Sequence, residues 1–314
     1  MARRKASWQV WLRRIAQTGF AVLFLYVFLQ AEYRPINRTG GHVKLFFELD
    51  PLVMISSWLA SHQVASGLLL SLVVLGLTAL FGRWFCGWVC PFGALHHLIT
   101  SLRNRTAKQK IATDGYSQWQ KTKYYLLGAI LVAAVMGVNL AGWFDPFSFL
   151  YRSATLVIYP GLNDGTAWIF GWIYQHDPSI GSFKVTSVSE PVYEFLRHNV
   201  LPNAQPYFYG TVLIAIAFFA VVLLNLYRAR FWCRYICPLG ALLGVAGKNP
   251  LVQIKRNEDA CNQCRVCVVD CQGGADPEAT ANWKPAECFY CWNCQSACPH
   301  EALTFSLRVP GGKP

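Results

Sequence analysis

The chain has 314 residues, of which 54% are hydrophobic and only 14% charged, and its mean hydropathy is +0.28. This composition argues against an ordinary soluble domain and indicates a membrane protein. The net charge of +12 would suit nucleic acid, but no basic run is interleaved with aromatic residues, so we expect no nucleic acid partner.

Four apolar stretches are long enough to cross a bilayer as helices, which takes about 20 residues each. They are residues 15–31, 64–82, 124–143 and 207–227. Because no small-residue cleavage site follows the first stretch, we expect a retained anchor rather than a signal peptide.

Lys and Arg residues are concentrated in three segments that flank these stretches. Residues 1–14 carry five, 83–123 carry seven and 228–314 carry ten, whereas 32–63 and 144–206 carry three each. Since cytoplasmic loops carry the excess of basic residues, we expect a multi-pass protein of the bacterial cytoplasmic (inner) membrane with both termini in the cytoplasm. All 12 cysteines lie in the predicted cytoplasmic segments, which is the opposite of a secreted disulfide framework.

A sequence motif occurs twice at the end of an apolar stretch: RWFCGWVCPFGAL begins at Arg83 and RFWCRYICPLGAL at Arg230. Each copy closes a pair of predicted spans, so the pairs are parallel repeats related by an axis along the membrane normal. We therefore expect residues 1–249 to form an all-α four-helix membrane bundle built from two parallel two-helix repeats. Asp50 and Asp145, each before a proline, are expected to start turns or cap helices; a part in binding quinol protons is the alternative.

Residues 144–206 are rich in Pro, Gly and aromatic residues. We expect a long outer loop with one short helix that begins near Ser189, where SEPVYEFL places a capping serine before an early proline. The loop would serve as a docking surface or as an interfacial lid.

The four cysteines of the two motifs carry the first candidate metal site: Cys86, Cys90, Cys233 and Cys237. On a continuous helix, the Cβ atoms of residues four apart lie about 5–6 Å apart, whereas a disulfide requires about 3.5–4.5 Å. The proline after each second cysteine also disfavours α geometry there, so we expect the helix to break at Cys90 and Cys237. Four facing thiolates would suit a third iron-sulfur cluster or a tetrahedral metal ion; a reversible disulfide between the repeats and simple packing remain alternatives.

Residues 250–314 are predicted to form a cytoplasmic α+β domain that is too small to be stable through burial alone. Its cysteine motifs indicate a domain of the bacterial two-cluster ferredoxin type, in which bound clusters supply the missing stability. CNQCRVCVVDC and CFYCWNCQSACP each place cysteines at x2, x2 and x3 spacing, and in two-cluster ferredoxins the fourth cysteine ligates the other cluster. The predicted ligands of one [4Fe-4S] cluster are Cys261, Cys264, Cys267 and Cys298, and those of the other are Cys288, Cys291, Cys294 and Cys271. A tetrathiolate zinc ribbon is the alternative, but it would leave half of these cysteines unexplained.

The segments that flank these motifs, LVQIK at 251–255 and ALTFSL at 302–307, are strand-like and are expected to pair around the clusters. Cys298 is followed by a proline, as the pattern requires, whereas Cys271 is followed by Gln272 and two glycines. All seven histidines lie outside the four predicted spans, so a b-type haem held by two mid-membrane histidines is not expected.

With these motifs the chain resembles the NapH/NosR family of membrane polyferredoxins. The resemblance implies electron transfer between the quinone pool or a cytoplasmic donor and a respiratory redox partner. The expected partners are membrane lipid, quinone and other redox subunits of the ferredoxin-like or cytochrome c type. It also implies an electron-transfer subunit of an oxidoreductase of the quinol dehydrogenase type rather than a standalone enzyme. The alternative function is an assembly or maturation factor for a respiratory metalloenzyme that uses redox-active or metal-binding thiols.

Overall fold

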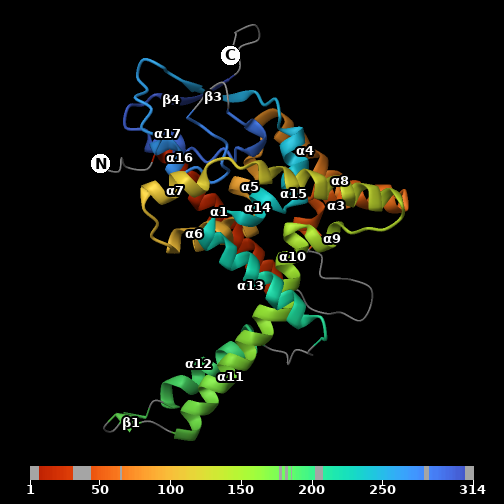
Figure 1. The fold of residues 1–314 in the computed structure, drawn as a ribbon. Coiled ribbons are helices and arrows are strands. Elements are labelled where there is room, and N and C mark those ends of the chain that lie inside the picture. Colours follow the sequence, from red (N-terminus) through yellow and green to blue (C-terminus); the bar gives the residue numbers. More distant parts are fainter. Residues whose placement is uncertain are drawn as a thin grey trace. The chain divides into compact units, whose positions relative to one another are not determined.

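The computed structural model describes residues 7–30, 44–63, 66–176, 179–180, 183–184, 186–201, 208–278 and 283–307. The described chain is mostly helical and contains two two-stranded antiparallel sheets (Figure 1). It divides into two compact units, one made of 1–149 with 221–314 and the other of 150–220.

The first part of the chain forms a series of helices. They are α1 (Trp8–Leu29), α2 (Lys44–Glu48), α3 (Pro51–Ser61), the 3-10 helix η1 (Ser66–Leu69), α4 (Leu70–Phe81), α5 (Trp84–Trp88), α6 (Pro91–Leu102), α7 (Ala107–Asp114), the 3-10 helix η2 (Gln118–Lys121), α8 (Thr122–Val135), α9 (Ala141–Phe144) and α10 (Pro146–Ser153). The C-terminal part contains α13 (Thr211–Tyr227), α14 (Phe231–Tyr235), α15 (Pro238–Ala246), β3 (Val252–Arg256), α16 (Val266–Val269), the 3-10 helix η5 (Pro285–Glu287), α17 (Asn293–Ala297) and β4 (Leu303–Leu307).

Among the helices of the described residues, α1 is both long enough and apolar enough to cross a membrane. The second and fourth predicted spans correspond to shorter apolar helices, Ser66–Phe81 and Thr211–Tyr227. Residues 31, 64 and 207, at the ends of three predicted spans, lie outside the described residues.

The helix of the third predicted span is shorter than expected, because α8 ends at Val135 and not near residue 143. Gly137 follows with a φ of 84°, a left-handed conformation that glycine adopts readily and that terminates helices. The side chain of Asn139 then accepts a hydrogen bond from the Ala141 amide at 3.2 Å, where α9 begins. Hydropathy continues through this turn, so the sequence pattern did not reveal it.

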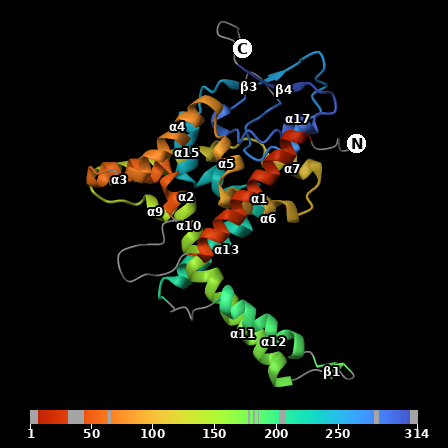
Figure 2. The ribbon, with the colours of Figure 1, turned by 180° about the vertical axis from the view of Figure 1, so that it is seen from behind.

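The segment 144–206, predicted as a long outer loop with one short helix near Ser189, contains more helix than predicted within its described residues. The 150–220 unit contains the π-helical turn η3 (Ala154–Ile158), α11 (Tyr159–His176) and α12 (Thr186–Asn199), with a short β1–β2 ladder (Ser179–Ile180 and Phe183–Lys184) between α11 and α12. Pro160, which has no amide hydrogen to donate, lies just after the π-helical turn η3, where the helix passes into α11. α12 begins before Ser189, and Figures 1 and 2 show α11 and α12 side by side, with the Phe170 and Tyr193 rings 4.9 Å apart.

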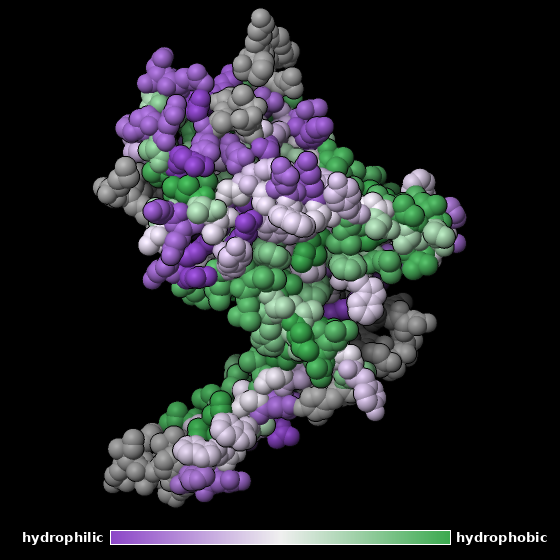
Figure 3. Space-filling model, in the orientation of Figure 1, coloured by the Kyte–Doolittle hydropathy of each residue, from purple (hydrophilic) through white to green (hydrophobic). Residues whose placement is uncertain are grey.

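The predicted pairing of the strands that flank the cysteine motifs is confirmed. β3 pairs with β4 in antiparallel register from Val252↔Leu307 to Arg256↔Leu303. Ile254 and Leu303 of this sheet pack with Cys294 in a buried cluster. Figure 3 shows mostly hydrophilic residues over this cysteine-rich part, whereas hydrophobic residues gather over the ends of α3 and α8. The predicted domain boundary at 249/250 falls between α15 and β3.

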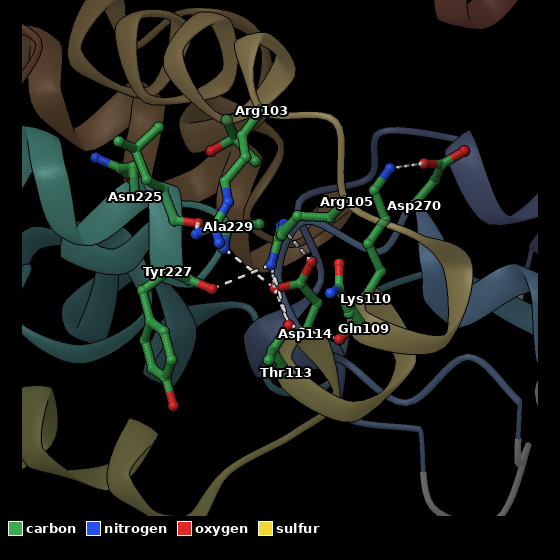
Figure 4. A network of polar contacts seen from close by, with 12 residues as sticks. Arg103, Arg105, Gln109, Lys110, Thr113, Asp114, Asn225, Tyr227, Ala229 and Asp270 are labelled. Carbon is green, nitrogen blue, oxygen red and sulfur yellow. Dashed lines mark hydrogen bonds and ion pairs between the residues drawn. The ribbon is translucent and has the colours of Figure 1, made fainter.

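A buried ion pair fixes the chain just before the second cysteine motif (Figure 4). Arg105 donates to Asp114, with Nη2 to Oδ2 at 2.7 Å, and also to the carbonyl of Tyr227 at 3.1 Å. Asp114 accepts in turn from the amide of Ala229 at 3.2 Å. The segment around α7 is thereby attached to the C-terminal end of α13.

The predicted capping role of the two Asp-Pro sequences is confirmed. Asp50 Oδ1 accepts from the Leu52 amide at 2.8 Å at the start of α3, and Asp145 Oδ2 accepts from the Ser148 amide at 2.8 Å at the start of α10. Both carboxyl groups are fully buried, and they lie close enough for their charges to interact. Burial and the neighbouring Asp145 carboxylate raise the pKa of Asp50 well above its ordinary value.

This carboxyl pair predicts a pH dependence of stability. In the folded chain Asp50 keeps its proton above pH 3.8, where the unfolded chain has lost it. Unfolding then releases a proton, so the free energy of unfolding should fall as pH rises, by about 1.4 kcal/mol per pH unit until the folded pKa is reached. Asp50→Asn retains the hydrogen bonds without the proton and should flatten this slope.

The measurement is thermal unfolding of the full chain in detergent over a series of pH values. Asp259→Asn, at an exposed position, is the control and should leave the slope unchanged. An equal slope in wild type and Asp50→Asn would exclude a proton shared by the pair.

Candidate functional site: the cysteine centres

The two C-terminal cysteine motifs share an unusual backbone. Gln263 and Tyr290, which precede the second cysteine of each motif, have φ values of 58° and 49°. Arg265 and Trp292, which follow that cysteine, have φ values of 58° and 55°. Left-handed non-glycine residues cost roughly 1–3 kcal/mol each and cluster at binding sites, where alternating conformations turn backbone amides toward an anion.

The first cavity of the cysteine-rich part has a volume of about 390 Å³ and is lined by four cysteines. Three come from the first motif and the fourth from the end of the second motif: Cys261, Cys264, Cys267 and Cys298. Burial raises the pKa of Cys267 to about 12.

A second, smaller cavity is lined by the complementary set: Cys271, Cys288, Cys291 and Cys294. The short helix α16 leads from the first motif to Cys271 and therefore delivers it to the cavity of the second motif. α17 likewise ends at Cys298, which lines the first cavity. Each cavity is thus lined by three cysteines of one motif and by the fourth cysteine of the other.

Single-ion and cluster sites differ in how their ligands are arranged. Across the described ranges, no group of three or more Cys, His, Asp or Glu side chains could hold one metal ion. The four ligands of a [4Fe-4S] cluster each bind a different iron, so they surround a cavity instead of meeting at one point. The cysteines around each cavity would be the ligands of such a group; the first cavity has the volume for it, whereas the second encloses only about 10 Å³.

The Gln272-Gly273-Gly274 sequence, which replaces the expected proline, is explained by close packing. A Cβ on Gly273 would lie 2.0 Å from the Glu287 carbonyl oxygen, and one on Gly274 would lie 2.1 Å from Arg234 Nη2. Gln272 Nε2 lies 3.0 Å from Nδ1 of His97 on α6. The loop after Cys271 is therefore shaped by contact with the part of the chain that carries the paired Cys-x3-Cys-Pro motifs.

The predicted helix break at the second cysteine of each Cys-x3-Cys-Pro motif is confirmed. Cys90 and Cys237 are the extended N-cap residues of α6 and α15, with ψ values of 115° and 109°. Cys237 Sγ accepts from the Gly240 amide at 3.2 Å, so this sulfur lies at the positive end of a helix.

The four cysteines of these motifs are all buried. Arg230, at the start of the second motif, donates to the Cys86 carbonyl at 2.8 Å, so the two motifs are in contact. All twelve cysteines belong to the described residues, and each is a free thiol in the structure.

Sequence reasoning missed a buried carboxylate, Glu287, directly before Cys288. Its Oε2 accepts from Arg83 at 3.3 Å, from Gln120 at 3.1 Å and from Lys123 in a short contact. Tyr124 donates to the other oxygen at 3.0 Å. Burial lowers the pKa of Lys123 to about 8, although attraction to Glu287 opposes this shift. Glu287 therefore joins the first motif and the start of α8 to the C-terminal cysteine-rich part.

The N-terminal helix is joined to the same region. Arg13 of α1 is fully buried and donates to Asn293 Oδ1 at 3.2 Å, and Gln17 Nε2 donates to the Gly87 carbonyl at 2.6 Å. One face of α1 thus contacts both the first Cys-x3-Cys-Pro motif and the second C-terminal motif. The only signal in the sequence was a charged residue on an apolar helix.

Comparison with known proteins identifies the kind of site. A family model described as a 4Fe-4S binding domain matches residues 63–108 and 209–257, and each of these segments contains one Cys-x3-Cys-Pro motif. The ferredoxin-type protein NapH of Escherichia coli strain K12 is 25% identical over 84% of this chain and 76% of its own length. The regulatory protein NosR of Stutzerimonas stutzeri is 25% identical over 69% of this chain and 23% of its own.

The chain is a polyferredoxin of the NapH/NosR type. The putative electron transport protein YccM of Escherichia coli strain K12 is 26% identical over 79% of this chain and 57% of its own length. No solved structure matches the chain. This NapH/NosR-type polyferredoxin is accordingly an iron-sulfur protein of an electron-transport family.

Proposed function

We propose that the protein passes single electrons, through two [4Fe-4S] clusters in its C-terminal domain, between the quinone pool or a cytoplasmic donor and a respiratory redox partner. Cys261, Cys264, Cys267 and Cys298 would hold one cluster, and Cys288, Cys291, Cys294 and Cys271 the other. The protein acts as an electron-transfer subunit and carries out no bond-making reaction alone.

The observation that carries this proposal is the exchange of the fourth cysteine between two cysteine-lined cavities. A zinc ribbon does not require that exchange, whereas it is characteristic of two-cluster ferredoxins. Such clusters supply reversible one-electron chemistry without proton transfer to a substrate. The chain holds their sulfur ligands in two adjacent cavities, which share the buried packing around Trp283 and Phe305.

We further propose that residues 1–249 form the four-span bundle of two parallel repeats in the cytoplasmic membrane. The length of α1 supports this, as do the large apolar side chains exposed on helices of the other three predicted spans. They include Leu72, Val73 and Leu80 on α4, Tyr125 and Val132 on α8, and Val212, Leu213, Ile216 and Phe219 on α13. Soluble monomers rarely expose contiguous apolar surfaces of this kind, whereas lipid and quinone favour them.

Anaerobic purification of the full chain in detergent, followed by metal analysis and EPR of the reduced protein, tests the assignment. We expect about eight iron and eight acid-labile sulfide per chain from the C-terminal domain, because each cluster contributes four of each. The two reduced clusters should interact magnetically, since their ligand sets interleave. Zinc without sulfide would refute the proposal.

A further inference from the structure

Two buried arginines accompany the paired Cys-x3-Cys-Pro motifs. Arg83 precedes Cys86 by three residues, and Arg230 precedes Cys233 by the same spacing. Both side chains are fully buried. A buried guanidinium is costly unless acceptors or anions surround it, so each of these residues requires a specific explanation.

Each arginine reaches across to the motif of the other repeat. Arg230 Nη1 donates to the Cys86 carbonyl at 2.8 Å. A Cβ on Gly240 would lie 2.7 Å from Arg83 Nη2, and one on Gly93 would lie 3.4 Å from Arg230 Nη1. The glycine of each Cys-Pro-x-Gly sequence therefore lies under the arginine of the opposite motif, which explains why both motifs contain it.

Several donors of the two guanidinium groups have no acceptor. Arg83 Nη1 donates to Ala286 O at 2.8 Å and to Glu287, but Nε and Nη2 of both Arg83 and Arg230 are unpartnered within the described part of the chain. Both guanidinium groups lie over the Phe289 ring, at 5.0 and 4.9 Å from its centre. Contact with an aromatic ring offsets part of the cost of burying the charge, but the ring accepts no conventional hydrogen bond.

Both guanidinium groups lie against the backbone that carries the buried thiols. Arg83 Nη2 would lie 2.7 Å from a Cβ on Gly240, whose amide donates to Cys237 Sγ at 3.2 Å, and Arg230 Nη1 donates to the Cys86 carbonyl at 2.8 Å. Two fixed positive charges with free N–H groups beside four sulfur ligands suit an anionic metal–sulfur group, whose sulfur atoms accept hydrogen bonds.

We propose that Arg83 and Arg230 are crossed donors to an anionic iron-sulfur group held by Cys86, Cys90, Cys233 and Cys237, and that they raise its reduction potential. This inference rests on the proposed electron-transfer function. This group would accept one electron from the C-terminal cluster ligated by Cys288, and that cluster would thereby be oxidised by one electron. The arginines remain protonated, so fixed charge offsets the added electron and no proton is required.

The position of Phe289 supports this electron path. It follows Cys288 directly, and its ring is contacted by both arginines. A Cβ on Gly87 would lie 2.3 Å from the Phe289 carbonyl oxygen, so the backbone after Cys288 packs against the first Cys-x3-Cys-Pro motif. The backbone beside Cys288, which lines the second cavity, therefore lies against the motif that carries Cys86 and Cys90.

The test is an EPR-monitored redox titration, with iron and sulfide analysis, of the full chain prepared anaerobically. Wild type should show a third cluster signal beyond the two C-terminal ones. Arg83→Gln and Arg230→Gln should each weaken reduction of that cluster at least tenfold, which is 59 mV for one electron. The signal of the cluster assigned to Cys261, Cys264, Cys267 and Cys298 should keep its potential, because neither arginine lines its cavity.

Two further variants separate the electrostatic effect from loss of structure. Arg197→Gln removes an exposed arginine on α12, and it should leave the third potential unchanged. Arg83→Lys and Arg230→Lys retain the charge and should lower the third potential less than the glutamine variants do. If a glutamine variant does not fold, the lysine variant at the same position is compared with wild type instead.

Three results would overturn the inference. They are a wild type with only the two C-terminal clusters, a third potential unchanged in both glutamine variants, and copper or zinc in place of iron at the four cysteines. The first of these leaves the proposed function intact, whereas a protein without any iron-sulfur signal would refute the proposed function itself.

Discussion

Replacing Cys298 with alanine should abolish the cluster of Cys261, Cys264 and Cys267, although Cys298 belongs to the other sequence motif. The reason is spatial, because Cys298 lines the first cavity together with those three residues. The iron content of the C-terminal domain should fall by about half, and one of its two reduced EPR signals should disappear.

The matched comparison is Cys291→Ala, a change within the same motif as Cys298. It should abolish the other signal, because Cys291 lines the second cavity. Cys271→Ala should give the same spectrum as Cys291→Ala. If Cys298→Ala and Cys291→Ala removed the same signal, each motif would hold its own cluster and the exchange of ligands would be wrong.

Replacing Glu287 with alanine should destabilise the folded chain by about 3–5 kcal/mol, because one partner of a buried charge network is removed. Arg83 and Lys123 are fully buried and both pair with this carboxylate. The alanine variant leaves both cations without their anion. Chemical unfolding of the purified protein in detergent, followed by tryptophan fluorescence, gives the free energy of unfolding.

An exposed ion pair provides the control for this change. Glu258 is 77% exposed and pairs with Arg256, so Glu258→Ala should cost at most about 1 kcal/mol. Adding Lys123→Met to the Glu287→Ala variant removes one uncompensated charge and should restore part of the stability. If the Glu258 and Glu287 variants lost similarly small amounts of stability, the contact of the first motif and α8 with the C-terminal cysteine-rich part would not depend on buried charge.

The sequence predicted features that depend on local spacing. The two flanking strands, the break of the helix at Cys90 and Cys237, and the caps at Asp50 and Asp145 were all visible as short patterns. The ligand sets of the two C-terminal clusters followed from spacing together with the general rule of exchanged ligands. They remain predictions until the cluster content is measured.

Features that depend on contacts between distant segments could not be predicted. Glu287 lies 204 residues from Arg83 in the chain, so no local pattern links them. Arg83 and Arg230 were noticed as part of the repeated motif, but their crossing to the opposite motif is a property of the folded chain. The early end of α8 and the helices of 146–176 were missed because hydropathy and proline content do not report backbone conformation.

The contact between Arg13 and Asn293 has a consequence for biosynthesis. These residues are 280 positions apart, so α1 leaves the ribosome long before its partner is made. At translation rates of about 5–20 residues per second, the delay is roughly 14–56 s. During that interval Cys86 and Cys90 are already synthesised, whereas the C-terminal segment that packs against them is not. Metal can therefore reach these cysteines before that segment folds over them.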